Sequence, residues 1–379
     1  MRVLFVNENI GGHATVHHHL LQTLTTYHPE VDFDVLAVPP RRGIRRWAGA
    51  RIPGLAGLDL DFQALRAQLS ASAWVHRRLA SCVQQYDAVH LYTHNAGLLS
   101  GSLLDGVPLV VSLDTTTAHN AWRIPHRSPS RFTPLTVAAS RPFENRIFAA
   151  ANRIVANSKW AAKSLRDDYG IDEGRLRMFP FGIVAPPFPG PAPGALGGEL
   201  PRIVFVGRQL ERKGGHRLLR LHQRHLVGRA RLVLITEEPV TPAPDVEVVD
   251  DLHPGDDRLW SILRQAALFV FPSTIDQAPN AVIEAMAAGL PVVGVDTAAL
   301  PEMVQAGVSG SLVAPDASDS ELLGAIEGLL DKPDTRARYG AAARCRFEQS
   351  YDARVSTATL VALLDEVVRS TPPASVIRR

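Results

Sequence analysis

Short apolar runs rich in β-branched residues alternate along the chain with longer stretches of helical periodicity. This alternation is typical of parallel sheets covered by helices on both faces, so the fold class is α/β. The first series of strands is predicted at 3–6, 33–38, 88–92, 109–113 and 153–156. A second series is predicted at 203–206, 232–235, 246–249, 268–271, 292–295 and 311–313.

The two series of strands indicate two domains, because 379 residues exceed what one hydrophobic core normally supports. Residues 184–201 lie between them and can hardly be helix or strand, since they are rich in proline and glycine. We therefore expect a first domain at 1–185, a linker at 186–201 and a second domain at 202–352. The prolines of this segment are Pro186, Pro187, Pro189, Pro191 and Pro193.

Composition and charge exclude several classes of protein. Apolar residues make up 46% and charged residues 21% of the chain, which is ordinary for a globular enzyme. The net charge of +2 gives no sign of nucleic-acid binding. Cys82 and Cys345 cannot build a disulfide framework, which fits a reducing cytoplasm. The apolar opening is soon interrupted by Asn7 and Glu8, and no run of about 20 apolar residues predicts a membrane span.

The most informative motif runs from Asp276 to Pro291. Two carboxylates, Asp276 and Glu284, are separated by seven residues and flank a Pro279-Asn280 turn. Glu284 is expected at the start of a short helix that Gly289 ends, with Pro279 as its first residue. The amides at a helix start bind phosphate, whereas carboxylates accept hydrogen bonds from sugar hydroxyls. The predicted ligand therefore carries both groups, as a nucleotide sugar does.

This motif, with its trailing Glu-Ala-Met-Ala-Ala-Gly-Leu-Pro-Val-Val, resembles the signature of the family 4 glycosyltransferases. The family usually has Glu at the position of Asp276. An ordinary amphipathic helix with chance carboxylates is the alternative interpretation. The resemblance implies the GT-B fold, in which two doubly wound Rossmann-like domains face each other across a cleft. It also implies that a C-terminal helix within 353–379 packs back on the first domain, and that transfer is retaining and independent of metal.

A second motif follows the strand predicted at 203–206. Arg208 and Lys213 should emerge at its carboxyl end, where a planar fork and a point charge together suit a diphosphate. Fixed cations stabilise the charge that develops on a leaving nucleoside diphosphate, so both are candidate catalytic residues. The resembled family has its phosphate-binding segment here. Surface cations without a ligand are the alternative interpretation.

The first predicted strand is followed by Gly11, Gly12 and His13 and then by a helical pattern. The double glycine allows a ligand to approach the backbone closely, and it is similar to the family's opening loop near the donor phosphates. No dinucleotide fingerprint and no P-loop occur, so a nicotinamide dehydrogenase and a P-loop kinase are not favoured. The apolar positions expected on one face of the helix are Val16, Leu20, Leu24 and Tyr27.

Histidines cluster at positions 13, 17, 18 and 19, and His13 with His17 has the spacing of zinc ligands. No acidic or cysteine ligand stands nearby, and the resembled family works without a metal, so no metal or other cofactor is expected. His13 is instead expected on the acceptor side. Asp114 stands where the family commonly has a catalytic histidine; it could orient a hydroxyl, accept a proton or cap the next helix. His94 and His119 are possible substitutes.

The sequence thus predicts a glycosyltransferase that uses a nucleoside diphosphate sugar and a glycan or lipid-linked acceptor. The alternative is a non-catalytic nucleotide-sugar sensor, suggested by the aspartates at 114 and 276. The predicted catalytic residues are Asp276, Asp114, Arg208 and Lys213. The predicted donor-binding residues are Gly12, Arg208, Lys213, Asp276, Ala278, Asn280, Ala281 and Glu284, and those on the acceptor side are His13 and His119.

One basic segment has no place in this scheme. Five arginines between 41 and 51 are interleaved with isoleucine and tryptophan. The pattern fits either a solvated loop over the cleft or a peripheral contact with an anionic membrane surface. The residues are Arg41, Arg42, Ile44, Arg45, Arg46, Trp47, Arg51 and Ile52.

Overall fold

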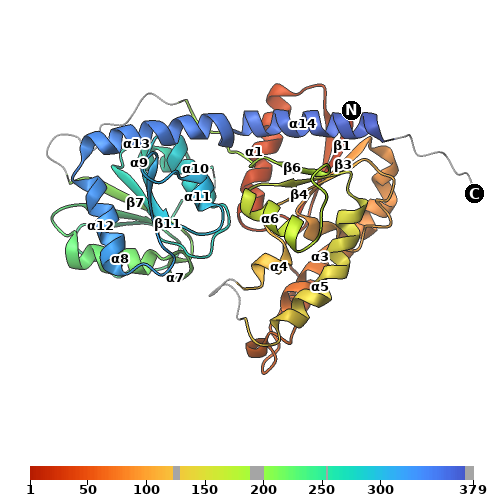
Figure 1. Cartoon of the computed structure of the whole chain (residues 1–379), viewed down its shortest axis with the longest axis horizontal. Helices are drawn as coiled ribbons and strands as arrows, with labels where there is room; N and C mark the ends of the chain where they lie inside the picture. Colours follow the sequence, from red (N-terminus) through yellow and green to blue (C-terminus); the bar gives the residue numbers. More distant parts are fainter. Residues whose placement is uncertain (123–128, 188–199, 253–254, 372–379) are drawn as a thin grey trace, which may run out of the picture. The chain divides into compact units, whose positions relative to one another are not determined.

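The computed structural model describes residues 1–122, 129–187, 200–252 and 255–371. It divides into two compact units (Figure 1). Unit 1 comprises Met1–Gly182 with Ala353–Arg379, and unit 2 is the continuous segment Ile183–Asp352. The division thus falls three residues before the expected domain end at 185. Most of the expected linker, and the last residues of the expected C-terminal helix, lie outside the described residues.

Unit 1 contains a parallel sheet in the order β2-β1-β3-β4-β5-β6. The five strands predicted in this half of the chain are confirmed to within one residue at each end. β6 was not predicted, because its sequence Leu-Arg-Met has no β-branched residue and only its leucine is buried. The strands are β1 (Arg2–Asn7), β2 (Asp32–Ala37), β3 (Ala88–Tyr92), β4 (Leu109–Leu113), β5 (Arg153–Ala156) and β6 (Leu176–Met178).

Helices cover both faces of this sheet. On one face α1 (Gly12–Tyr27) contacts α14 (Ala353–Ser370), and both contribute to a core cluster with β1 and β4. Tyr27, expected on the buried face of α1, is exposed because the helix ends there. The opposite face is covered by α3 (Gln63–Cys82), α5 (Thr133–Ala150) and α6 (Lys159–Asp167). The short helices are α2 (Ile44–Ala48), η1 (Ala56–Leu58), η2 (Val83–Gln85), η3 (His94–Gly97) and α4 (Thr117–Asn120).

Unit 2 contains a second parallel sheet, in the order β12-β11-β10-β7-β8-β9, with a core of its own. All six predicted strands are confirmed. They are β7 (Arg202–Val206), β8 (Arg231–Ile235), β9 (Val246–Val249), β10 (Leu268–Phe271), β11 (Val292–Val295) and β12 (Gly310–Val313). The helices are α7 (Leu210–Lys213), α8 (Gly215–His225), α9 (Asp257–Arg264), α10 (Asn280–Ala287), α11 (Leu300–Met303), α12 (Asp319–Leu330), α13 (Pro333–Arg346) and η4 (Phe347–Tyr351).

Each sheet has a point where the order of its strands reverses. In unit 2 this point lies between β7 and β10, and in unit 1 it lies between β1 and β3. Doubly wound sheets bind ligands beyond the carboxyl ends of the strands at such a reversal. The loops after these four strands are therefore where a site is expected. Among the described residues, no helix has both the length and the apolar character needed to span a bilayer.

Candidate active site

The loops after β7 and β10 bring opposite charges together in unit 2. Lys213, the last residue of α7, has its Nζ 3.1 Å from Asp276 Oδ1, and Arg212 Nη1 is 3.5 Å from the same oxygen. Ser273 donates a hydrogen bond of 2.6 Å to the other oxygen, Asp276 Oδ2. Lys213 Nζ also lies 5.1 Å from the ring centre of Phe271, at the end of β10. One hydroxyl and two cations therefore fix the carboxylate.

Two glycines allow α7 to approach the end of β10 this closely. Gly214 has a φ of +76°, and a Cβ there would lie 2.4 Å from the carbonyl oxygen of Pro272. A Cβ on Gly207 would lie 2.7 Å from Cδ of Lys213. A larger residue at either position would displace α7 or the lysine, so the glycines place Lys213 beside Asp276.

The environment of Asp276 keeps it ionised. Burial acts to raise the pKa of Asp276, but the charge of Lys213, the hydrogen bond from Ser273 and the charge of Arg212 outweigh burial. The pKa is therefore held below its ordinary value. At neutral pH the cluster consists of one carboxylate and two cations, which leaves one positive charge for an anionic ligand.

Helix α10 differs in two details from the helix predicted around Glu284. Pro279 is its N-cap with a ψ of 122°, and not its first residue, so the helix begins at Asn280. Glu284 is consequently the fifth residue of α10 rather than lying at its start. The predicted end is confirmed, since Gly289 has a φ of 71° and its amide bonds to the carbonyl of Met286 at 3.0 Å.

The start of α10 can accept an anion. No side chain caps the helix, and the amide of Ala281 has no acceptor among the residues that the structure describes. Ala278 and Asn280 are partly buried beside it. Free amides and the helix dipole favour a negatively charged group at such a helix end. The predicted donor-binding residues of this segment thus surround one helix start.

Glu284 lies one turn further along α10, on the same partly exposed face as Asn280. Its side chain makes no hydrogen bond or ion pair with any other described residue. Burial raises the pKa of Glu284 to about 7, although the charge of Lys213 opposes the increase. A buried carboxylate without a hydrogen-bond or ion-pair partner destabilises the folded protein. Such destabilising groups are typical of ligand-binding sites.

We expect Glu284→Gln to stabilise the unbound protein at pH 8 and to leave its stability unchanged near pH 4.5. Because folding raises the pKa of this carboxyl group from 4.5 to about 7, its ionisation lowers the free energy of unfolding. This loss increases as the pH rises from 4.5 to about 7 and is constant at higher pH. The gain at pH 8 should be on the order of 1 to 3 kcal/mol, or several degrees in Tm. Thermal melts of both proteins across this pH range measure it, and equal Tm values at pH 8 would contradict the raised pKa.

Arg208 is not part of this cluster. Its Nε lies 2.8 Å from Glu237 Oε1, and both side chains are more than half exposed. Glu237 follows Thr236, whose hydroxyl donates to the Arg208 carbonyl at 3.3 Å. The expected pairing of Arg208 with Lys213 is thus replaced by a pairing of Arg212 with Lys213. Arg212 has no role predicted from the sequence, although its position next to Lys213 was a usable signal.

The double-glycine loop of unit 1 also forms a cluster of opposite charges. Gly11 has a φ of +50°, a Cβ there would meet no atom within 4 Å, and α1 begins at Gly12. His13 Nε2 lies 3.1 Å from Asp114 Oδ2, and His13 Nδ1 lies 3.9 Å from Glu8 Oε2. One imidazole ring therefore sits between two carboxylates, beside a loop whose backbone a ligand can approach.

The charges of this cluster are set by mutual attraction. Burial lowers the pKa of His13, but the charges of Asp114 and Glu8 outweigh it and raise the pKa to about 9. Burial raises the pKa of Asp114, but the charge and hydrogen bond of His13 hold it below its ordinary value. Thr93 and Asn95 donate to Glu8 Oε2 at 2.5 and 3.2 Å. Glu8 is a further residue without a role predicted from the sequence, although it directly follows β1.

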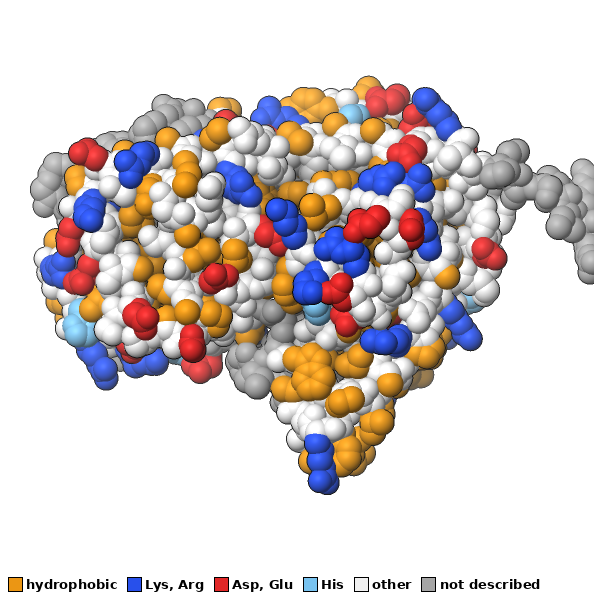
Figure 2. Space-filling model, viewed as in Figure 1, with side chains coloured by type: hydrophobic (Ala, Val, Ile, Leu, Met, Phe, Trp, Pro, Cys, Tyr) orange, Lys and Arg blue, Asp and Glu red, His pale blue; other side chains and the backbone are white. Residues whose placement is uncertain are grey.

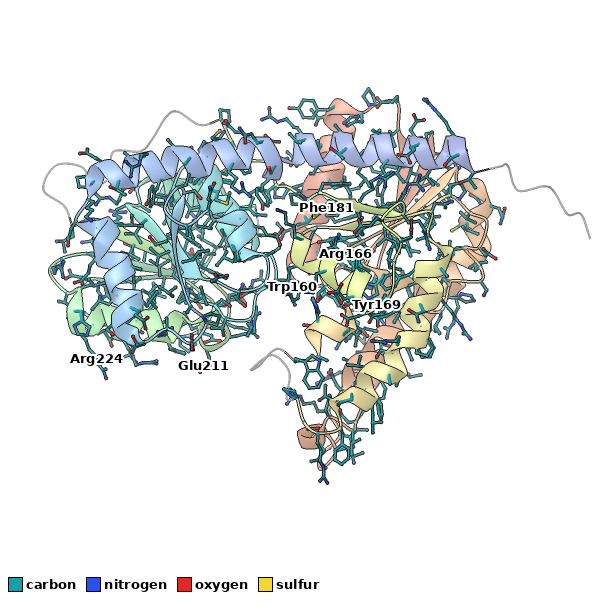
Figure 3. All side chains as sticks on the ribbon, viewed as in Figure 1. Trp160, Arg166, Tyr169, Phe181, Glu211 and Arg224 are labelled. Carbon is teal, nitrogen blue, oxygen red and sulfur yellow. The ribbon has the colours of Figure 1, made fainter. Side chains whose placement is uncertain are left out.

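The alternative role for Asp114, as a helix cap, is wrong. The N-cap of α4 is Thr116, whose hydroxyl accepts from the amide of His119 at 3.3 Å. His94 is no substitute at the site either, because it is buried and its Nε2 lies 2.9 Å from Oε1 of the buried Glu144. His119 is partly exposed and packs on Trp160, with ring centres 4.6 Å apart. Trp160 is labelled in Figure 3.

The histidines of α1 do not gather around a metal position. His17 is buried against Phe5, with ring centres 6.5 Å apart, whereas His13 contacts Asp114. Burial lowers the pKa of His17 to about 4, so it is a neutral core residue at pH 7. Among the described residues, no group of three or more histidine, cysteine or acidic side chains is arranged to hold a metal ion.

Comparison with known proteins identifies the family. A model described as Glycosyltransferase Family 4 matches residues 10–185, and a model described as Glycosyl transferases group 1 matches residues 200–332. The chain belongs to the family 4 glycosyltransferases. The two matches cover most of the chain, and their boundary falls at the same region as the division between the two units. The protein is therefore a hexosyltransferase-type glycosyltransferase with the GT-B fold.

Individual known proteins are similar to the chain over most of its length. The alpha-maltose-1-phosphate synthase of Mycolicibacterium smegmatis is 29% identical over 346 residues, which cover 81% of this chain and 84% of that protein. Two solved structures share the fold. Sucrose-phosphate synthase from Thermosynechococcus elongatus matches with a TM-score of 0.72, 17% identity and coverage of 98% of this chain and 100% of that one. Anabaena Alr3699/HepE in complex with UDP-glucose matches with a TM-score of 0.61, 15% identity and coverage of 96% and 99%.

Proposed function

We propose that this glycosyltransferase moves a hexosyl group from a nucleoside diphosphate sugar to an acceptor hydroxyl, with retention of anomeric configuration and without a metal ion. The observation that supports this most is the cluster of Lys213, Arg212 and Asp276 in the unit that contains the uncapped start of α10 and the unpartnered Glu284. Cations and helix amides suit a diphosphate, and carboxylates suit hydroxyls. The related HepE structure contains UDP-glucose, a ligand of this kind.

The donor is held by the cations of unit 2, by the start of α10 and by two carboxylates. Lys213 and Arg212 bind the diphosphate together with the amide of Ala281. Arg208 joins them after leaving Glu237, because an exposed ion pair contributes only about 0 to 1 kcal/mol and is easily exchanged. When Lys213 pairs with the diphosphate, its ion pair with Asp276 is broken. Asp276 then accepts hydrogen bonds from hydroxyls of the transferring sugar. The remaining contacts come from Glu284 to the ribose hydroxyls, and from Gly12, Ala278 and Asn280.

Catalysis rests on charge stabilisation at the leaving group. As the bond between the anomeric carbon and the phosphate oxygen breaks, the diphosphate gains negative charge, which fixed cations stabilise more than the ground state. The acceptor hydroxyl attacks from the same face, and its proton passes to the departing phosphate oxygen. Such a front-face substitution needs no side-chain nucleophile, and Lys213 and Arg212 supply the positive charge that a metal would otherwise provide.

The groups of unit 1 act on the acceptor. With a pKa of about 9, His13 is protonated at neutral pH and cannot serve as a general base. Asp114 is ionised but weakly basic, because His13 holds its pKa down. Asp114 therefore accepts a hydrogen bond that orients the acceptor hydroxyl, while His13 fixes the position of the carboxylate. We propose that His119, in the short helix α4, lines the same acceptor side.

A donor screen followed by product analysis tests the proposal. One nucleoside diphosphate sugar among UDP, GDP and ADP derivatives should raise Tm, because a specific ligand stabilises the folded state. With that donor, release of nucleoside diphosphate should continue in EDTA, and NMR should show the donor's anomeric configuration in the product. An inverted anomer would overturn retention, and loss of activity in EDTA would overturn metal independence. Donor binding with neither transfer nor hydrolysis would favour the sensor alternative.

A further inference from the structure

One end of unit 1 combines positively charged side chains with exposed apolar side chains. We call residues 41–58 the basic tip. This segment contains α2 and η1, and α2 packs on α3. Ser130, just before α5, donates a hydrogen bond of 2.5 Å to the carbonyl of Leu58, so the tip also lies against the start of α5. Figure 2 shows hydrophobic side chains gathered at this end of unit 1, with basic side chains beside them.

The apolar side chains of the basic tip contribute little to the folded unit. Ile44 is 86% exposed and Trp47 is 78% exposed, and their spacing of three residues places them on one face of α2. Burying such a side chain stabilises a protein by roughly 1.5 to 3 kcal/mol. These two side chains do not contribute that free energy to the folded unit. The surrounding apolar residues that are also exposed are Ile52, Leu55, Leu58 and, on α5, Leu135.

The charge of the basic tip is not compensated within the tip. Residues 41–58 contain five arginines and no acidic residue. Burial, and then the charge of neighbouring Arg41, lower the pKa of Arg45, as expected in a positive environment. The next carboxylates along the chain are turned inward. Asp59 accepts from the hydroxyl of Thr133 at 2.7 Å, and Asp61 accepts from the amide of Ile52 at 3.0 Å.

Hydrogen bonds from side chains of α3 hold the basic tip in place. Gln63 Nε2 donates to the carbonyl of Gly49 at 2.8 Å, and Arg66 Nη2 donates to the carbonyl of Ala50 at 2.7 Å. The tip is therefore a preformed surface, which binds without the entropic cost of ordering a loop.

We propose that the basic tip docks unit 1 on the surface of an anionic phospholipid bilayer. Ile44 and Trp47 enter the boundary between headgroups and acyl chains, where tryptophan is favoured. The exposed Arg42, Arg46 and Arg51 meet the anionic headgroups, each contributing about 1 kcal/mol. A nucleic acid would use the cations but not the protruding isoleucine, whereas a bilayer uses both. This inference goes beyond the proposed transfer reaction, and it makes a lipid-linked acceptor the expected class.

Vesicle flotation of the whole protein tests the proposal. Wild-type protein should float with vesicles of phosphatidylcholine and phosphatidylglycerol at low salt, and much less with phosphatidylcholine alone or at high salt. The double variant Ile44→Ser with Trp47→Ser should reduce flotation at least tenfold. Arg42→Gln with Arg46→Gln should remove most of the difference between low and high salt.

Matched controls lie on unit 2. Arg220→Gln with Arg224→Gln changes the charge equally at exposed positions of α8, and Arg224 points away from unit 2 (Figure 3). Val227→Ser removes an exposed apolar side chain there. These controls should float like the wild type, and all variants should keep the wild-type Tm and the same Tm increase with the donor. Quenching of Trp47 fluorescence by brominated lipids, lost in a Trp47→Phe variant, should show that this side chain enters the bilayer.

Three results would overturn the docking proposal: no flotation of the wild type at low salt, equal flotation with neutral and anionic vesicles, or wild-type flotation of the Ile44 and Trp47 variant. A failure here leaves the donor screen unaffected, because the basic tip belongs to unit 1 and the donor-side cluster belongs to unit 2. Conversely, an inactive protein that still floats would count against the proposed reaction and in favour of the docking surface.

Discussion

Replacing Lys213 with methionine is expected to lower kcat/KM for the donor by about 30- to 150-fold. The change removes the proposed charge-assisted contact to the diphosphate, which should contribute about 2 to 3 kcal/mol in the transition state. Much of the loss should appear in kcat, because the charge on the leaving group is largest as the glycosidic bond breaks. Steady-state release of nucleoside diphosphate, measured at several donor concentrations, separates kcat from KM.

The fold of unit 2 should survive this substitution, since Asp276 keeps its contacts with Arg212 and Ser273. Lys213→Arg keeps the charge and should retain more activity than Lys213→Met, which distinguishes an electrostatic role from simple packing against Phe271. Arg224→Met, on the surface of α8, is the matched control for loss of a cation and should leave kcat/KM unchanged. A kcat/KM within twofold of wild type for Lys213→Met would remove the diphosphate role.

Replacing Asp276 with asparagine is expected to lower kcat by about tenfold or more while leaving the affinity for free nucleoside diphosphate equal or increased. In the proposed reaction Asp276 contacts the transferring sugar, which gains positive charge in the transition state and is stabilised by a carboxylate. The substitution also frees Lys213 from an ion pair of 3.1 Å, so the cation becomes more available to a phosphate. Steady-state kinetics and calorimetric titration with the free nucleotide measure the two effects.

The comparison variant is Glu284→Gln, which removes the proposed contact to the ribose. It should chiefly raise the donor KM and weaken the free nucleotide, because that contact is similar in ground and transition states. Asp276→Glu introduces the residue more usual in the family and should change sugar preference without changing nucleotide affinity. If Asp276→Asn weakens the free nucleotide as much as Glu284→Gln does, the two carboxylates do not have separate roles.

Eleven of the twelve strands that the structure describes were predictable because they are short runs rich in apolar residues between turn signals. The candidate site was inferred from them, since parallel strands place their carboxyl ends at one edge of each sheet and the informative motifs lie in the loops after β1, β7 and β10. β6 was not predictable in this way, because it has only three residues, none of them β-branched, and its Met178 is exposed.

The pairing of charges could not be predicted from the sequence. His13 and Asp114 are 101 residues apart, and only the order of β1, β3 and β4 in the sheet brings them to 3.1 Å. The family resemblance made Arg208 a stronger candidate than Arg212. The contact of Arg212 with Asp276, however, depends on the short helix α7 and on Gly214. Spacing along a chain indicates which groups reach an edge, whereas packing decides which of them meet.

The two ends of unit 2 lie side by side. Ile183 and Asp352 form an isolated β-bridge, and the amide of Ile183 donates to the carbonyl of Tyr351 at 3.0 Å. Unit 2 is thus inserted into unit 1 as one uninterrupted piece of chain with adjoining ends, an arrangement that tolerates exchange of the inserted piece. Under the proposed division of roles, a chimera that carries the equivalent of residues 183–352 from a relative should use that relative's donor and keep this protein's acceptor, so the two specificities could evolve, or be engineered, separately.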